Sequence, residues 1–186
     1  MELVCTPCAC GADEELALLP GDLPGAQPGA RAGAHRLGPG FVAAAQQLGA
    51  GWTLAATGEP GTAIFLVTGR AWRPDAGGTA RSCPVLRALR PVAGGAPQCF
   101  TARKKGFAAA WITLSDKGAQ GARTDEAGPL VGELLASALP LALCRGYLLP
   151  DEPGELRALL SDLALHQGFD LVCTTGGTGL SPRDQT

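Results

Sequence analysis

Apolar and polar positions follow one another in regular blocks through the second half of the chain. An apolar run of strand length covers residues 107–114, and two further runs cover 141–149 and 169–174. Between these runs, residues 126–139 and 153–167 repeat leucine and alanine at helical spacing. Strands that alternate with helices of this length are typical of βαβ units and a parallel sheet. The first run is apolar enough to be a central strand, but the pattern leaves the strand order open.

Each of the two predicted helices has one apolar face, which we expect to pack against the sheet. The face of the first helix consists of Leu130, Val131, Leu134, Leu135 and Ala138. The face of the second helix consists of Leu156, Leu159, Leu160 and Leu163. Pro140 and Gly168 are typical stop signals at the ends of these helices.

The first hundred residues show a weaker pattern. Many glycine and proline residues lead us to expect that residues 1–40 are loop or disordered, apart from one or two helical turns at 13–19. Residues 41–48 predict a short helix, and 52–56 and 62–68 predict two strands joined by a turn. The pattern indicates a small, partly β region.

Residues 69–97 are again rich in glycine and proline, and they contain five arginines that we interpret as a solvated face. These arginines are Arg70, Arg73, Arg81, Arg87 and Arg90. The charged stretch 103–106 marks the predicted domain boundary. We therefore expect an N-terminal region over 1–102, whose residues indicate no known family, and an α/β domain over 107–186.

Composition excludes some classes of partner. Charged residues make up 17% of the chain and the net charge is −2, without a basic stripe, so nucleic acid is not expected as a partner. No apolar run reaches the roughly 18 residues that a membrane-spanning helix needs. The N-terminus carries Glu2 where a signal peptide would have basic residues, so we expect a cytoplasmic protein.

Seven cysteines are scattered along the chain, and a cytoplasmic location would keep them reduced. Cys5, Cys8 and Cys10 have the spacing C-x-x-C-x-C, which can begin a metal site. A second pair at metal-ligand spacing is missing, so the sequence leaves metal binding there open. His35 stands alone among small residues and is interpreted as structural or exposed.

Polar clusters follow all three predicted strands of the α/β domain. Ser115 and Asp116 follow the first strand, Asp151 the second, and a glycine-rich loop at 174–179 the third. The carboxyl ends of parallel strands meet at one edge of the sheet, so we expect these groups to converge there. A glycine-rich loop suits a phosphate, Arg183 can pair with a phosphate, and Asp184 can hold Mg²⁺.

Each of these features also has a structural interpretation. A glycine-rich turn after a strand can be only a tight turn. Ser115 and Asp116 can end a strand in a side-chain turn, and Asp151 and Asp184 can cap the helices that follow them. Capping and catalysis are compatible, so both interpretations stay open.

Four blocks of residues resemble the MogA/MoaB family of molybdenum-cofactor biosynthesis proteins. They are T-T-G-G-T-G-L-S-P-R-D at 174–184, I-T-L-S-D-K-G at 112–118, D-E-A-G-P at 125–129 and L-P-D-E at 149–152. Their order and spacing also match the family. Lys117 replaces the usual arginine, which keeps the charge but loses the planar fork. The resemblance covers residues 107–186 only.

The resemblance implies a molybdopterin adenylyltransferase, in a three-layer α/β domain with a parallel or mixed sheet and flanking helices. Such enzymes use ATP and Mg²⁺ to attach AMP to the terminal phosphate of molybdopterin, releasing pyrophosphate. Asp151 and Asp184 match the family's catalytic and metal-binding carboxylates. The residues that match its substrate-binding positions are Ser115, Asp116, Thr175, Gly176, Gly177, Thr178, Gly179, Ser181 and Arg183.

Further expectations also come from the resemblance. Family members assemble as trimers or larger oligomers, and other molybdenum-cofactor biosynthesis proteins are possible partners. The rival function is a non-catalytic molybdopterin-binding or scaffold module. Family members continue well beyond the R-D-x-T motif, whereas this sequence stops at Thr186, so we expect a fragment whose activity belongs to a longer parent.

Overall fold

The computed structural model describes residues 1–20, 34–38, 40–59, 61–74 and 78–178. The chain divides into two compact units, Met1–Lys105 and Gly106–Thr186. This division falls inside the charged stretch 103–106 of the sequence. No helix in the described part of the chain is long and apolar enough to cross a membrane.

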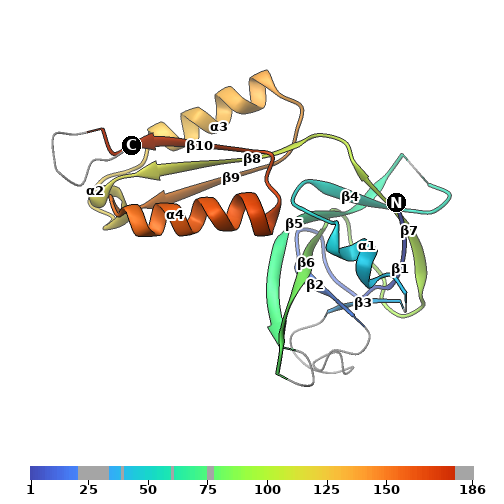
Figure 1. Ribbon diagram of the computed structural model, residues 1–186. Helices are drawn as coiled ribbons and strands as arrows, with labels where there is room; N and C mark the ends of the chain where they lie inside the picture. Colours follow the sequence, from blue (N-terminus) through green and yellow to red (C-terminus); the bar gives the residue numbers. More distant parts are fainter. Residues whose placement is uncertain (21–33, 39, 60, 75–77, 179–186) are drawn as a thin grey trace. The chain divides into compact units, whose positions relative to one another are not determined.

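The first unit is a closed barrel of seven strands in the order β1-β3-β2-β6-β5-β4-β7 (Figure 1). The strands are β1 (Glu2–Thr6), β2 (Glu15–Pro20), β3 (His35–Leu37), β4 (Trp52–Ala56), β5 (Ala63–Pro74), β6 (Ala80–Ala88) and β7 (Gln98–Lys104). Their buried side chains fill the interior, with Phe65 and Phe100 the largest. A short helix, α1 (Val42–Gln46), packs Ala45 against this core.

The expectation of loop or disorder for residues 1–40 is wrong for the three strands β1, β2 and β3. The segment at 13–19, predicted as helical turns, enters β2 instead. Its Leu16 lies opposite Leu86 of β6, and Glu15 opposite Arg87, with which it forms an ion pair at 3.0 Å. Pairing within the barrel outweighs the local helical preference, and Leu18 of β2 is completely buried there.

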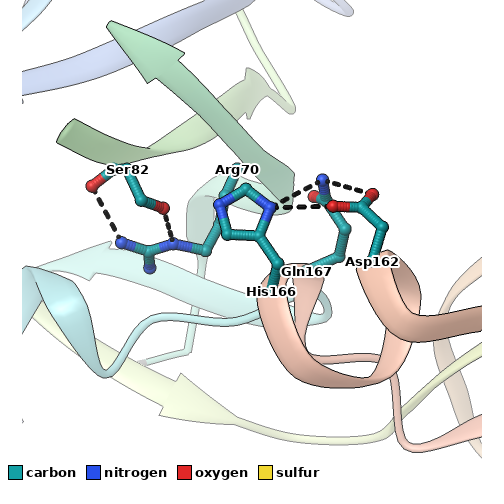
Figure 2. Close-up of polar contacts among 5 residues, drawn as sticks. All are labelled: Arg70, Ser82, Asp162, His166 and Gln167. Atoms are coloured by element: carbon teal, nitrogen blue, oxygen red, sulfur yellow. Dashed lines mark hydrogen bonds and ion pairs between the residues drawn. The ribbon is translucent and has the colours of Figure 1, made fainter. Parts of the chain in front are cut away.

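The interpretation of residues 69–97 as a solvated face also needs correction. Strand β5 runs on to Pro74 and β6 occupies much of the segment. Arg70 is half-buried, and its guanidinium donates to the carbonyls of Leu48 (2.7 Å) and Ala45 (3.3 Å), near the carboxyl end of α1. It also donates to Ser82 Oγ at 2.6 Å, as Figure 2 shows. This arginine therefore satisfies helix carbonyls that would otherwise need water.

The second unit contains a parallel sheet of three strands in the order β10-β8-β9. The strands are β8 (Phe107–Leu114), β9 (Leu141–Leu149) and β10 (Leu171–Gly176), which places the first predicted strand at the centre. The chain steps from β8 to one edge and then crosses back to the other edge. Right-handed crossovers in opposite directions put the two connecting helices on opposite faces. Figure 1 shows α3 (Ala127–Ala138) and α4 (Pro153–Ser161) on the two sides of the sheet, giving three layers.

Helix α3 packs against the sheet with only part of the predicted face, since Val131 and Leu135 are half-buried. Leu130 and Leu134 are 55% and 60% exposed, whereas Gly128 and Gly132 are buried. Both glycines lie against Trp111 of β8, where an added Cβ at Gly132 would come within 2.6 Å of the indole ring. The large Trp111 side chain fills the space between the sheet and the helix. At the points of contact the helix therefore has glycines, which have no side chain.

Helix α4 follows the prediction more closely. Leu163 is buried and Leu156, Leu159 and Leu160 are half-buried. The last turns widen into a π-helix, η1 (Asp162–Gln167), which Gly168 ends in the left-handed conformation at φ 77°. Within η1, His166 Nδ1 lies 2.9 Å from Asp162 Oδ1, and Gln167 donates to Asp162 Oδ2 at 3.0 Å (Figure 2).

Candidate functional site

Ser115 lies directly after the central strand and turns the chain into the short helix α2 (Asp116–Ala119). Its backbone is extended, and its Oγ accepts a hydrogen bond from the Gly118 N–H at 3.1 Å. This is the arrangement of an N-cap. Ser115 is therefore a helix cap, a role that the sequence analysis considered only for Asp151 and Asp184, and the residue lies at the carboxyl end of β8 as predicted.

Asp116 and Asp151 connect the ends of β8 and β9. The Asp116 N–H donates to Asp151 Oδ2 at 3.1 Å, and the Asp151 N–H donates to Asp116 Oδ1 at 3.0 Å. Asp151 does not cap α4, since the N-cap residue of that helix is Glu152. The sequence expectation that these two residues converge at one edge of the sheet is met.

The second carboxylate oxygen of Asp151 has chemical significance. Oδ1 is enclosed and has no hydrogen-bond partner among the residues that the structure describes. An enclosed carboxylate oxygen without a donor is costly, and a divalent cation is one group that can satisfy it. The described part of the chain contains no group of three or more His, Cys, Asp or Glu side chains placed to hold a metal. Asp151 is therefore one potential ligand, and the described residues do not complete a set of three around it.

The glycine-rich loop begins where β10 ends. Gly176 pairs with Leu114 in the parallel ladder and has φ 87°, and Gly177 has φ 63°. A Cβ on Gly176 would lie 2.2 Å from the Leu114 carbonyl oxygen, so no other residue fits without a shift of the backbone. Successive glycines with positive φ allow backbone N–H groups to turn toward an anion. Thr175 is half-buried and Thr178 exposed, while Gly179, Ser181, Arg183 and Asp184 lie outside the described residues.

A cavity of about 380 Å³ opens at the same edge of the sheet. Ser115 and Gly176, both predicted from the sequence, line it. The lining residues that were not predicted as site residues include Thr113, Asp125, Glu126 and Leu130. Asp125 and Glu126 belong to one of the sequence blocks that carry the family resemblance, so a signal for them was present. Thr113 also belongs to such a block, at 112–118, although its apolar surroundings predict only one more residue of a buried strand.

The cysteine-rich N-terminus forms no metal site in the described structure. Cys5 and Cys10 are buried in the barrel, and burial raises the pKa of Cys5 to about 12, so this thiol stays protonated. A protonated thiol is a poor metal ligand. His35 is fully buried and structural: its Nδ1 accepts from the Cys8 N–H at 3.2 Å, and its ring contacts Phe65 edge to face.

Comparisons with known proteins agree on the second unit. Residues 110–186 match the family model described as "Probable molybdopterin binding domain". The molybdopterin adenylyltransferase of Pyrococcus furiosus is 43% identical over 75 residues, which cover 40% of this chain and 43% of the relative. That of Escherichia coli K12 is 38% identical over 77 residues, covering 40% and 39%.

The solved structure of the tungsten cofactor synthesizing protein MoaB from Pyrococcus furiosus is 40% identical, with a TM-score of 0.38, and the match covers 44% of this chain and 49% of that one. The chain thus spans less than half the length of each of these relatives. Residues 110–186 of this chain are therefore similar to molybdopterin-binding domains, in agreement with the resemblance to the MogA/MoaB family.

Proposed function

We propose that the protein takes part in molybdenum-cofactor biosynthesis by adenylating molybdopterin with ATP. One observation carries this proposal: Ser115, the Asp116–Asp151 pair and the Gly176–Gly177 turn meet at one edge of a parallel sheet, in a segment 43% identical to a molybdopterin adenylyltransferase. The reaction needs an anion site, carboxylates and an open edge where two substrates can meet.

In this reaction an oxygen of the terminal phosphate of molybdopterin attacks the α-phosphorus of ATP. A new P–O bond forms, the bond to the β-phosphate oxygen breaks, and pyrophosphate leaves. The positive-φ turn at Gly176 and Gly177 fixes a phosphate through backbone N–H groups. We assign phosphate contacts also to Thr175, Thr178, Gly179, Ser181 and Arg183, on the strength of the resemblance alone.

The fit of Mg²⁺ rests on the enclosed, unpaired Oδ1 of Asp151. Asp151 would hold the ion together with Asp184, the second carboxylate that the family resemblance implies. When bound, Mg²⁺ neutralises negative charge on the reacting phosphates. Asp116 orients Asp151 by accepting its backbone N–H, and so acts as a positioning residue.

The test is pyrophosphate release from ATP in the presence of molybdopterin and Mg²⁺. We expect transfer by the wild type, and loss of at least a hundredfold in Asp151→Asn. Glu133→Gln is the matched control, because it removes an exposed carboxylate of α3 that does not line the cavity. Tight molybdopterin binding without AMP transfer would establish the rival function, a binding or scaffold module. Light scattering on the same sample measures the oligomeric state and so tests the expected homo-oligomer. The cytoplasmic location stays a prediction.

A further inference from the structure

A small hollow lies on the outer surface of the barrel, where β4 and β7 run side by side. Its volume of about 10 Å³ admits one water molecule or one oxygen atom of a larger ligand. All of its lining residues belong to the first unit, whereas the candidate site described above is formed by residues of the second. The lining residues are Thr53, Ala55, Ala63, Thr101, Arg103 and Lys105.

The alternation of side chains along β7 places Thr101 and Arg103 on the outer face of the barrel. Their neighbours Phe100 and Ala102 are 0% and 1% exposed and belong to the barrel core, and successive side chains of a strand point to opposite faces. Lys105 follows directly after the end of β7 and also lines the hollow. One segment of the chain therefore presents a hydroxyl, a guanidinium and an ammonium group to one small space.

The hollow exists because the residues beside β7 are small. Ala55 pairs with Thr101 on one side and with Ala63 of β5 on the other, so two methyl groups leave the space open. Thr53 pairs with Arg103, and its Oγ1 donates to the Arg103 carbonyl oxygen at 3.1 Å. This bond fixes the backbone from which the guanidinium extends, without engaging the guanidinium itself.

The two cations of the hollow have no ion-pair partner within the part of the chain that the structure describes. This holds although acidic residues outnumber basic ones in the whole sequence, 17 against 15. Glu2 of β1 pairs with Thr101 in the barrel sheet, yet it forms no ion pair with Arg103 or Lys105 among these described residues. Two neighbouring cations repel each other, and an anion between them relieves the repulsion.

We propose that this hollow binds a small tetrahedral oxyanion, with one oxygen in the hollow against the Thr101 hydroxyl and the other oxygens between Arg103 and Lys105. An oxyanion offers acceptors, and these three side chains supply donors, two of them charged. A free oxyanion and the phosphate group of a nucleotide share this chemistry, and the experiment separates them. The proposal concerns the barrel and does not depend on the proposed function of the second unit.

The experiment follows the backbone amide NMR signals of the full chain during titration with inorganic phosphate, molybdate or AMP, at constant ionic strength balanced with chloride. We expect saturable shifts at Thr53, Thr101 and Arg103, which report on the barrel even where a probe also binds the second unit. Arg103→Ala should weaken phosphate binding at least tenfold. Arg73→Ala is the matched control, because Arg73 is an exposed arginine of the same barrel that does not line the hollow.

The three probes identify the source of the anion. Tighter binding of phosphate or molybdate than of AMP assigns the hollow to a free oxyanion. Tighter binding of AMP assigns it to the phosphate group of a nucleotide.

Two further changes separate the hollow from a general effect of surface charge, and thermal unfolding verifies that each variant is folded. Ala63→Leu fills the hollow but keeps both cations, and it should abolish the saturable shifts. Thr101→Val should weaken phosphate binding about fivefold, and Thr101→Ser, which keeps the hydroxyl, should restore it. The proposal is overturned if the wild type shows no saturable shift. It is also overturned if Ala63→Leu and Thr101→Val bind as the wild type does, or if Arg73→Ala weakens binding as much as Arg103→Ala.

Discussion

Asp116 and Asp151 each donate a backbone N–H to the carboxylate of the other, at 3.1 Å and 3.0 Å. The two residues are 35 positions apart in the sequence, and the pair connects the ends of the central strand β8 and its neighbour β9. Each carboxylate accepts a bond from a backbone amide, and such bonds to a charged acceptor are stronger than neutral ones. The pair therefore fixes the edge of the sheet at which the candidate site lies.

This pair predicts different effects for two substitutions of Asp151. Asp151→Asn keeps an oxygen for the Asp116 N–H, so thermal stability should stay near that of the wild type while the carboxylate charge is lost. Asp151→Ala leaves that N–H without its acceptor and should cost about 1–3 kcal/mol. Thermal and urea unfolding of both variants measures the difference. Equal destabilisation by Asn and Ala would mean that the charge, rather than the hydrogen bond, stabilises the edge.

A second prediction concerns the glycine at the start of the loop. Gly176→Ala should destabilise the second unit by at least about 2 kcal/mol, because the new Cβ meets the Leu114 carbonyl as well as a positive φ. Gly121 is a matched control, since it has φ 73° with nothing within 4 Å of its added Cβ. Gly121→Ala should therefore show the backbone strain alone. If both variants unfold alike in urea, the close approach to Leu114 has no energetic effect.

Gly132 and Trp111 should be energetically coupled. Gly132→Ala should cost about 1–3 kcal/mol, because its Cβ overlaps the indole ring. In a Trp111→Leu background the same change should be neutral or stabilising, as alanine favours a helix by about 1 kcal/mol over glycine. A double-mutant cycle from denaturant unfolding gives the coupling. Gly154→Ala in α4, where the added Cβ has open space, is the control, and an additive cycle would contradict the packing described here.

His35 should make the stability of the barrel depend on pH. Burial lowers the pKa of His35 from 6.5 to about 4. Between these two pH values the unfolded chain binds a proton on His35 and the folded barrel does not. The contribution of neutral His35 to the free energy of unfolding is fully present above pH 6.5. It is lost as the pH falls toward 4, which lowers the free energy of unfolding by up to about 3 kcal/mol. His35→Asn keeps an acceptor for the Cys8 N–H but does not titrate.

Hydrogen exchange of the barrel strands at pH 7 and pH 5, corrected for the intrinsic exchange rate, tests this dependence. The wild type should lose more protection free energy than His35→Asn between the two pH values. Equal losses in the two proteins would assign the acid sensitivity to other groups, such as the ion pair between Glu15 and Arg87.

The sequence by itself determined much of the second unit. Periodicity located its strands and helices, and strand ends placed Ser115, Asp116 and Asp151 at one edge. These predictions succeeded because a βαβ unit is built from neighbouring segments, each with its own apolar period. The glycine-rich string indicated a tight loop after the third strand. The structure gives a physical reason for one of its glycines, because Gly176 has no room for a side chain beside Leu114.

Tertiary structure alone decided the rest. The barrel closes through pairs such as Leu16 with Leu86, and a short strand with few local signals is fixed only by such a distant partner. Leu130 and Leu134 have the period of a core face, yet they are exposed because Trp111 occupies the space beneath Gly128 and Gly132. Thr113 looks like any strand residue until the fold leaves its hydroxyl enclosed beside a cavity. Periodicity tells which residues can be buried, but the volumes and hydrogen-bond partners of distant segments decide which ones are.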